Sequence, residues 1–204
     1  MGAAFQAIEH PKLLLGEGED EVRFFRSLLQ HLGLHDIQVA QTGGKRQRIH
    51  AFLKALPSFP GFSSLSALGV TCDADGDAHI EFQSICGGLG HAGFSVPGRM
   101  GERTTGPLHV SVYVLPDCAS EGTLETLCLN SVADDPAAAC VDQYFACVER
   151  EAKRQPANRW KARVHAWLSS HERPDLRLGE AAERRYWPFD GEAFAPLCAF
   201  LRQL

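Results

Sequence analysis

Short apolar runs alternate with longer amphipathic stretches between residues 11 and 132, and this alternation predicts an α/β fold. The run at 108–115 gives the clearest strand pattern, because its β-branched residues alternate with polar ones. We expect strands at 11–16, 36–40, 65–72 and 108–115, and helices at 19–33, 45–56, 79–90 and 123–132. Strands separated by helices pair in parallel, so the expected core is a parallel sheet of about four strands with helices on both faces.

From about residue 136 the chain carries only helical patterns. We expect helices at 137–154, 158–170, 179–185 and 191–203. The sequence therefore predicts an α/β domain over residues 1–135 and a helical C-terminal extension over 136–204. The extension is expected to pack on the sheet, so that the two parts form a single compact unit.

Three residues are expected to mark helix ends. Gly33 should end the first helix and Pro57 the second, because glycine adopts the left-handed conformation and proline cannot continue a helix. Asp77 is expected to cap the helix that follows it, because an aspartate side chain accepts hydrogen bonds from the first free backbone N–H groups.

Composition narrows the class of protein. A chain of 204 residues that is 45% hydrophobic can bury one good core. It has no apolar run of membrane-spanning length and no secretory signal pattern, and its seven cysteines include no C-x-x-C pair. We therefore expect a cytoplasmic protein without a membrane association. The net charge of −5 argues against a protein that coats nucleic acid by charge alone.

Two acidic clusters each follow an apolar run, and they are the most informative feature of the chain. Glu17 follows the first expected strand, and Asp73 and Asp75 follow the third. Ligands bind at the carboxyl ends of strands in open parallel sheets, so these three side chains should converge at one edge. Carboxylates about 4 Å apart repel by roughly 4 kcal/mol at an effective dielectric of 20, unless a cation lies between them. Oxygen-only ligands favour Mg²⁺, with Mn²⁺ as the second choice.

Three segments together resemble the Toprim domain found in topoisomerases, primases, small-RNA maturases and the overcoming-lysogenisation-defect (OLD) nucleases. The first is Leu14-Leu15-Gly16-Glu17-Gly18, and the second is Asp73-Ala74-Asp75. The third, Val114-Leu115-Pro116-Asp117 followed by Gly122-Thr123-Leu124-Glu125, resembles small standalone Toprim-like bacterial proteins with no assigned function. Gly16 departs from the usual pattern, in which a small apolar residue precedes the glutamate. The resemblance implies a Toprim-like Rossmannoid fold.

The same resemblance implies roles for five carboxylates. Glu17 would act as a metal ligand or proton acceptor, and Asp73 and Asp75 would bind metal, so these three form the expected catalytic set. Glu21 and Glu125 are candidates for a second ion, since two ions about 4 Å apart can stabilise both oxygens of a phosphodiester displacement. Two alternatives stay open. Glu21 can simply favour a helix N-terminus, and Glu125 can be a solvated residue in a first helical turn.

Basic residues offer candidate phosphate contacts. Lys45 lies in Gly43-Gly44-Lys45-Arg46, which is not a P-loop but can present amides and a lysine to a phosphate. Arg159 and Lys161 flank Trp160 within a basic stretch at 150–163, a composition that suits a nucleic-acid backbone. For both segments a plain helix start or a solvated helix face is the alternative.

Together these features predict a Mg²⁺-dependent Toprim-fold nuclease that cuts DNA or RNA. Several Toprim nucleases belong to bacterial defence systems, and we expect the same setting here. The expected partners are a nucleic acid substrate, an ABC- or SMC-like ATPase on a separate chain and, as a further candidate, a second copy of this chain. The alternative is a non-catalytic Toprim-like module that recognises a partner protein or a nucleotide phosphate.

Overall fold

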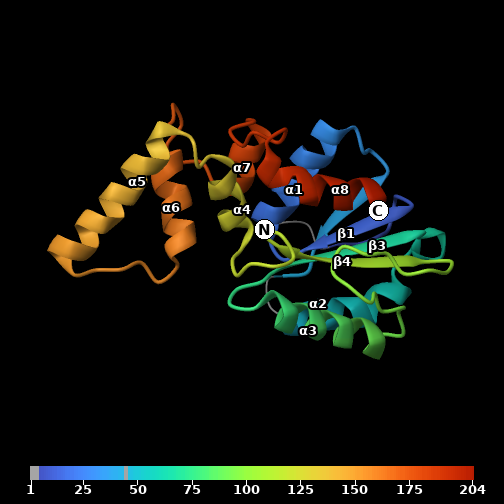
Figure 1. The fold of residues 1–204 in the computed structure, drawn as a ribbon. Helices are drawn as coiled ribbons and strands as arrows, with labels where there is room; N and C mark the ends of the chain where they lie inside the picture. Colours follow the sequence, from blue (N-terminus) through green and yellow to red (C-terminus); the bar gives the residue numbers. More distant parts are fainter. Residues whose placement is uncertain (1–4, 44–45) are drawn as a thin grey trace.

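The computed structural model describes residues 5–43 and 46–204, without the side chains of 46 and 47. A four-stranded parallel sheet forms its centre, in the order β2-β1-β3-β4 (Figure 1). The strands are β1 (Lys12–Gly16), β2 (Ile37–Gln41), β3 (Ala67–Asp73) and β4 (His109–Leu115). The expected α/β fold with a parallel sheet is confirmed. Within the described part of the chain, no helix has the length and apolar character needed to cross a membrane.

Helices cover both faces of the sheet (Figure 1). The helices α2 (Arg46–Ala55) and α3 (Ala78–His91) lie on one face; α1 (Glu19–Leu32), α7 (Leu178–Glu183) and α8 (Ala195–Gln203) lie on the other. Successive strand residues point to opposite faces, so Leu14 enters the hydrophobic core beneath α1, whereas Leu13 and Leu15 enter the core beneath α2 and α3. Both cores exclude solvent, which explains why β1 is a continuous apolar run rather than an alternating one.

The strand order fixes where a ligand can bind. The chain passes from β1 to β2 on one side and then returns to place β3 on the other side of β1. The connections on either side of this pair run in opposite directions, and a crevice opens at the carboxyl ends of β1 and β3. Glu17 directly follows β1, and Asp73 is the last residue of β3. Two of the predicted acidic residues therefore flank this crevice.

The C-terminal third begins with α4 (Leu124–Ser131), α5 (Pro136–Cys147) and α6 (Arg159–Leu168). In Figure 1, α5 and α6 project from the body, and we call residues 136–168 the helical arm. The base of the arm is anchored by Trp167, which is buried and stacks on Trp187 with ring centroids 4.8 Å apart. The proposed division at residue 135 stays a prediction.

One expected helix is shorter than the sequence pattern indicated. The helix predicted at 137–154 ends at Cys147, and a π-helical turn (Val148–Ala152) follows it. Lys153 then adopts a left-handed conformation, with φ of +53°, which a continuing helix does not allow. The basic stretch at 150–163 is therefore divided among a π turn, a loop and α6, and it is not one helix face.

The predicted helix ends mostly hold. Gly33 ends α1 with φ of +70°, and Asp77 caps α3 by accepting hydrogen bonds from the N–H groups of His79 and Ile80. Beyond α2, Pro57 lies within a short 3₁₀ turn (Leu56–Ser58). A second such turn spans Phe62–Ser64, and a third (Glu192–Phe194) replaces the first turn of the helix predicted at 191–203.

The contact between α7 and α1 provides a stability test. A Cβ added to Gly179 in α7 would lie 2.6 Å from the backbone oxygen of Asp20 and 2.7 Å from Cβ of Arg23. Gly179→Ala should therefore destabilise the protein by about 1–3 kcal/mol through forced separation of the two helices. Gly87→Ala is the matched control, because Gly87 is an exposed helical glycine with open space around its Cβ position. It should stabilise the fold by up to about 1 kcal/mol. Denaturant melts that showed equal effects of the two changes would contradict this packing.

Candidate metal centre

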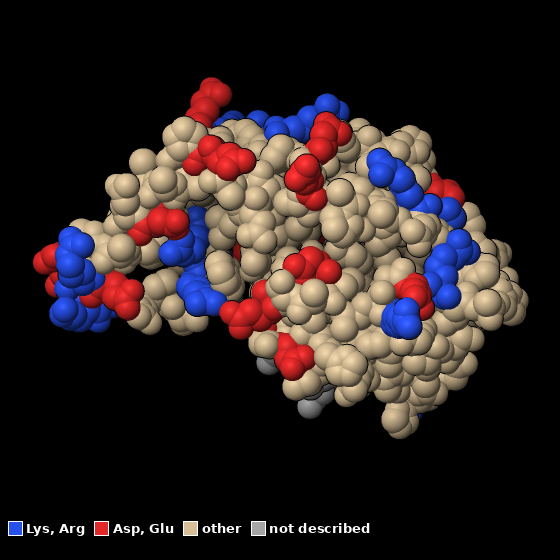
Figure 2. Space-filling view, viewed as in Figure 1, with Lys and Arg blue, Asp and Glu red and all other residues tan. Residues whose placement is uncertain are grey.

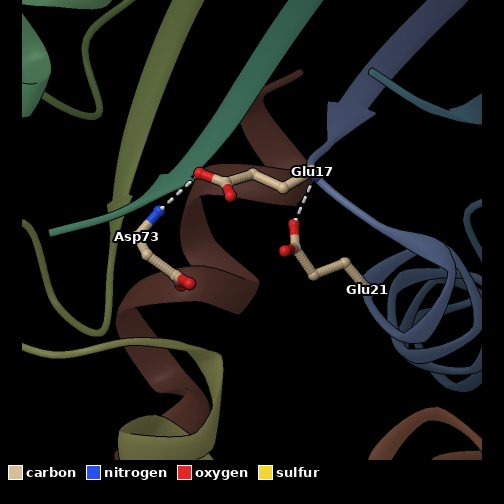
Figure 3. A group of neighbouring side chains, drawn as sticks. All are labelled: Glu17, Glu21 and Asp73. Atoms are coloured by element: carbon tan, nitrogen blue, oxygen red, sulfur yellow. Dashed lines mark hydrogen bonds between the residues drawn. The ribbon is translucent and has the colours of Figure 1, made fainter. Parts of the chain in front are cut away.

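Three carboxylates meet at the crevice between β1 and β3 (Figure 3). Glu17 follows β1, Glu21 lies in the first turn of α1, and Asp73 ends β3. One carboxylate oxygen from each lies within 4.8 Å of those of the other two. The backbone N–H of Glu17 donates to Oε2 of Glu21 at 2.7 Å, and the backbone N–H of Asp73 reaches Oε1 of Glu17 at 3.4 Å. We call Glu17, Glu21 and Asp73 the carboxylate cluster.

Local sequence explains how Glu21 enters the cluster. Glu21 is the third residue of α1, and a glutamate at this position can reach back to a free backbone N–H before the helix. Its carboxylate passes close to Gly16, where an added Cβ would lie 3.1 Å from Oε2 of Glu21. The absence of a side chain at Gly16 therefore leaves room for this carboxylate.

The segment after β4 positions Asp73. Gly122 and Asp75 exchange two backbone hydrogen bonds, of 3.0 and 3.1 Å, and this pairing ties the two loops together. The backbone N–H of Leu124, at the start of α4, then donates to Oδ1 of Asp73 at 2.9 Å. Gly122 has φ of +140°, and a Cβ there would lie 2.6 Å from Oγ1 of Thr126. The segment 122–124 thus holds the N-terminus of α4 against Asp73, where the helix dipole favours a carboxylate.

Burial and neighbouring negative charges raise the pKa values of all three carboxylates. Burial raises the pKa of Glu17, and the hydrogen bond from Asp73 only partly offsets this. Burial raises the pKa of Glu21 well above its usual value, and the charge of Asp73 adds to the shift. Burial and then the charge of Glu17 likewise raise the pKa of Asp73 well above its usual value. Within the described part of the chain, no lysine or arginine forms an ion pair with these three residues.

The other two predicted ligands lie at the margin of the cluster. Asp75 is exposed and has φ of +48°, and Glu125 is half-buried and accepts a hydrogen bond of 2.8 Å from Oγ1 of Thr123. Both lie outside the group of three, although their charges contribute to raising the pKa of Glu17 and of Asp73. The structure thus brings Glu17 and Asp73 together as expected, and it adds Glu21 rather than Asp75 as the third member.

The predicted phosphate contacts are more distant from the cluster. Arg159 and Lys161 lie in the first turn of α6, in the arm. Arg159 forms an ion pair with Glu121 at 3.1 Å, and Lys161 lines a cavity of about 270 Å³ together with Asp20 and Glu125. Lys45 lies outside the described residues.

The donor set of the cluster fits a small, hard divalent cation. All three side chains offer oxygen, which Mg²⁺ and Mn²⁺ prefer over softer ligands. Mg²⁺ binds oxygen at about 2.0–2.1 Å, so two ligands on opposite sides of one ion lie about 4.2 Å apart. The oxygens of the cluster, within 4.8 Å of one another, need only small rotamer adjustments to bind one ion.

Sequence reasoning named Gly16, Gly122 and Thr123 only as parts of longer segments and missed the roles that they have in building this site. Their signals were weak but present. A glutamate four residues after Glu17, at the third helical position, is the usual arrangement for a side chain that reaches back over a helix start. Thr123 precedes α4 as its N-cap, a position that threonine favours, and its hydroxyl also holds Glu125.

The fold and the site together define a class: a parallel α/β protein with a partly buried carboxylate cluster at the switch point of its sheet. The chain belongs to the family described as "Protein of unknown function (DUF3226)", whose sequence model matches residues 11–204. No curated protein and no solved structure matches the chain.

Proposed function

We propose that this protein is a Mg²⁺- or Mn²⁺-dependent nuclease of the Toprim type. The observation that carries the proposal is the convergence of Glu17, Glu21 and Asp73 within 4.8 Å at the switch point between β1 and β3. Three partly buried carboxylates so close together cost stability, because each ionised group raises the cost of ionising the others, and such arrangements are typical of functional sites. The order of the acidic motifs, which resembles that of Toprim domains, adds the substrate class.

Each residue has a defined task in this proposal. Glu21 and Asp73 would hold the ion, and the backbone N–H groups that bind them fix their orientation. Glu17, whose pKa burial raises above its ordinary value, is suited to accept a proton from an attacking water. Asp75 and Glu125, at the margin, are the candidates for holding a second ion. A bound Mg²⁺ would polarise the phosphate and lower the pKa of water.

We place this activity in the cytoplasm, an assignment supported by seven cysteines that are all free thiols. The proposed partners are DNA or RNA, an ABC- or SMC-like ATPase on a separate chain, and a second copy of this chain.

The direct test is cleavage by the purified protein. Plasmid, single-stranded DNA and structured RNA are incubated with millimolar Mg²⁺ or Mn²⁺, and parallel reactions contain EDTA. We expect products only in the presence of the divalent ion, because the carboxylate cluster has no other means of stabilising a charged phosphorus centre. Absence of cleavage for every substrate would favour the alternative, a Toprim-like module that binds a partner or a nucleotide phosphate without cutting it.

A further inference from the structure

A groove of about 600 Å³ lies between the helical arm and the edge of the body that carries the candidate metal centre. Its volume falls in the range of about 300–1,000 Å³ that is typical of ligand sites. Figure 2 shows Lys and Arg side chains on the arm, with Asp and Glu side chains among them, and further Asp and Glu side chains along the adjoining edge of the body. We call this cavity the arm groove. Its lining includes Asp75, Thr123, Arg154, Arg159, Trp160 and Arg163.

Three arginines give the arm groove a positive wall. Arg154 lies in the loop before α6, and within the described part of the chain it forms no ion pair. Arg159 pairs with Glu121, but both side chains are 61% exposed, and such pairs contribute little and yield readily to a phosphate. Arg163 forms an ion pair with Asp142, which does not line the groove. Three arginines and two acids, Asp75 and Glu149, line the groove itself, while the partners of Arg159 and Arg163 lie outside its lining.

The same wall carries flat, stackable surfaces. The guanidinium of Arg159 lies over the ring of Trp160, 4.3 Å from its centroid, and that of Arg163 lies 5.7 Å from the centroid of Phe145. All four side chains line the arm groove. Aromatic rings and guanidinium planes are the surfaces on which unpaired nucleobases stack. In a duplex the bases are already stacked on one another and do not offer their faces.

The arm groove also borders the two loops that lie beside the candidate metal centre. Asp75 and Thr123 both line the groove. Asp75 lies two residues after Asp73 of the cluster, and Thr123 directly precedes Leu124, whose backbone N–H donates to Asp73. We propose that the arm groove binds an unpaired segment of DNA or RNA, with its phosphates on Arg154 and Arg163 and a base on the Arg159–Trp160 pair. This inference rests on the proposed nuclease function and names its substrate as single-stranded nucleic acid.

Binding can be measured without any cleavage. Fluorescence anisotropy of the full chain in EDTA is recorded with labelled single-stranded DNA, single-stranded RNA and a duplex of the same sequence. We expect the two single strands to bind at least about tenfold more tightly than the duplex, equivalent to about 1.4 kcal/mol. Trp160→Ala should weaken single-strand binding by about tenfold or more, whereas Trp160→Phe, which keeps a stacking ring, should lose less.

A second variant guards against an effect of folding. Arg154 is exposed in a loop, so Arg154→Ala should fold normally, and it should reduce the slope of log affinity against log salt by about 0.7. Arg103→Ala, which removes an exposed arginine that does not line the groove, should change neither affinity nor slope. Equal effects of Arg154→Ala and Arg103→Ala, or a preference for the duplex, would overturn the groove assignment.

The outcomes separate this inference from the nuclease proposal. Metal-dependent cleavage that is unchanged in Trp160→Ala and Arg154→Ala would retain the nuclease and refute the arm groove as its substrate site. Single-strand binding that these variants weaken, in a protein that cuts nothing, would support the arm groove and refute the nuclease.

Discussion

Glu17→Gln should abolish metal-dependent cleavage, with a loss of about 10²–10⁴-fold, while the protein stays folded. The substitution keeps the size of the side chain and its ability to accept the backbone N–H of Asp73. It removes the negative charge that would help to hold a divalent ion and the site that would accept a proton. The measurement is the initial rate of cleavage at saturating Mg²⁺, with a thermal melt of the same preparation to verify the fold.

Two comparisons make this prediction specific. Glu102→Gln is a matched control, because Glu102 is exposed and lies on the segment beside β4, outside the carboxylate cluster. It should retain wild-type activity. Full cleavage by the Glu17→Gln protein would show that a contaminating enzyme or another site is responsible, and the assignment of the cluster would then be wrong.

The margins of the cluster allow the two ion sites to be told apart. Asp75 and Glu125 lie outside the group of three, so Asp75→Asn or Glu125→Gln should leave binding of the first ion intact. If these residues hold a second ion, each change should reduce the cleavage rate and shift half-maximal activity to higher Mg²⁺ concentration. A rate and Mg²⁺ dependence identical to wild type in both variants would limit the centre to one ion. The assay is a Mg²⁺ titration of the initial rate.

The sheet could be predicted from the sequence because burial on both faces requires continuous runs of apolar residues, which are easy to recognise. β1 and β3 are nearly continuous apolar runs, and every apolar residue in them enters one of the two cores. The acidic residues that follow them could be placed for the same reason, since parallel strands end at a common edge. Glu17 and Asp73 were therefore expected to meet, and their contact follows from the sheet alone.

Which carboxylates join the cluster depends on the conformation of the loops after the strands, and no apolar pattern in the sequence indicates that conformation. Asp75 and Asp73 are equivalent in the sequence, but a left-handed residue and a backbone pairing with Gly122 leave Asp75 exposed. That pairing joins residues from two loops distant in the chain, so local sequence does not specify it. Glu21 could be placed more readily, because a glutamate at the third position of a helix can reach back to the backbone before the helix start.

The arm was predicted least well, for a related physical reason. Its helix α5 buries only Val141 in the core, so tertiary packing places little constraint on where the helix ends. The break after Cys147 comes instead from a π turn and from the left-handed backbone of Lys153. Helical periodicity continued through this break, and it gave no sign that the basic residues would lie along a groove.

Removing one charge from the cluster should stabilise the metal-free protein, and the sign follows from the pKa shifts. Burial raises the pKa of Asp73 and Glu21 in the folded state above their unfolded values of about 3.9 and 4.3. Their contribution to stability is therefore fully present below about pH 4, and it is lost as the pH rises through the folded pKa values. At pH 7 in EDTA the folded protein must either keep these poorly solvated carboxylates charged or protonate them, and both cost free energy. The unfolded chain ionises the same groups freely.

Asp73→Asn and Glu21→Gln should consequently melt at higher temperature than wild type in EDTA at pH 7, and the difference should vanish near pH 4. Both amides keep a carbonyl oxygen for the backbone N–H groups that bind these side chains, so the comparison reports charge. Asp134→Asn, at an exposed aspartate outside the cluster, should show no such difference. A wild-type protein that is as stable at pH 7 as either variant would mean that the cluster is not strained.

Divalent ions should reverse this order of stability. At an ion concentration of 100 times Kd, binding to the native state alone contributes about 2.7 kcal/mol. For a chain of this size that corresponds to a rise in Tm of about 5–10 °C. Wild type should show this rise with Mn²⁺, whereas Asp73→Asn and Glu21→Gln should show little, because each lacks a charged ligand. An equal rise in wild type and in both variants would place the ion elsewhere, since a site built from Glu17, Glu21 and Asp73 cannot lose a charged ligand without loss of affinity.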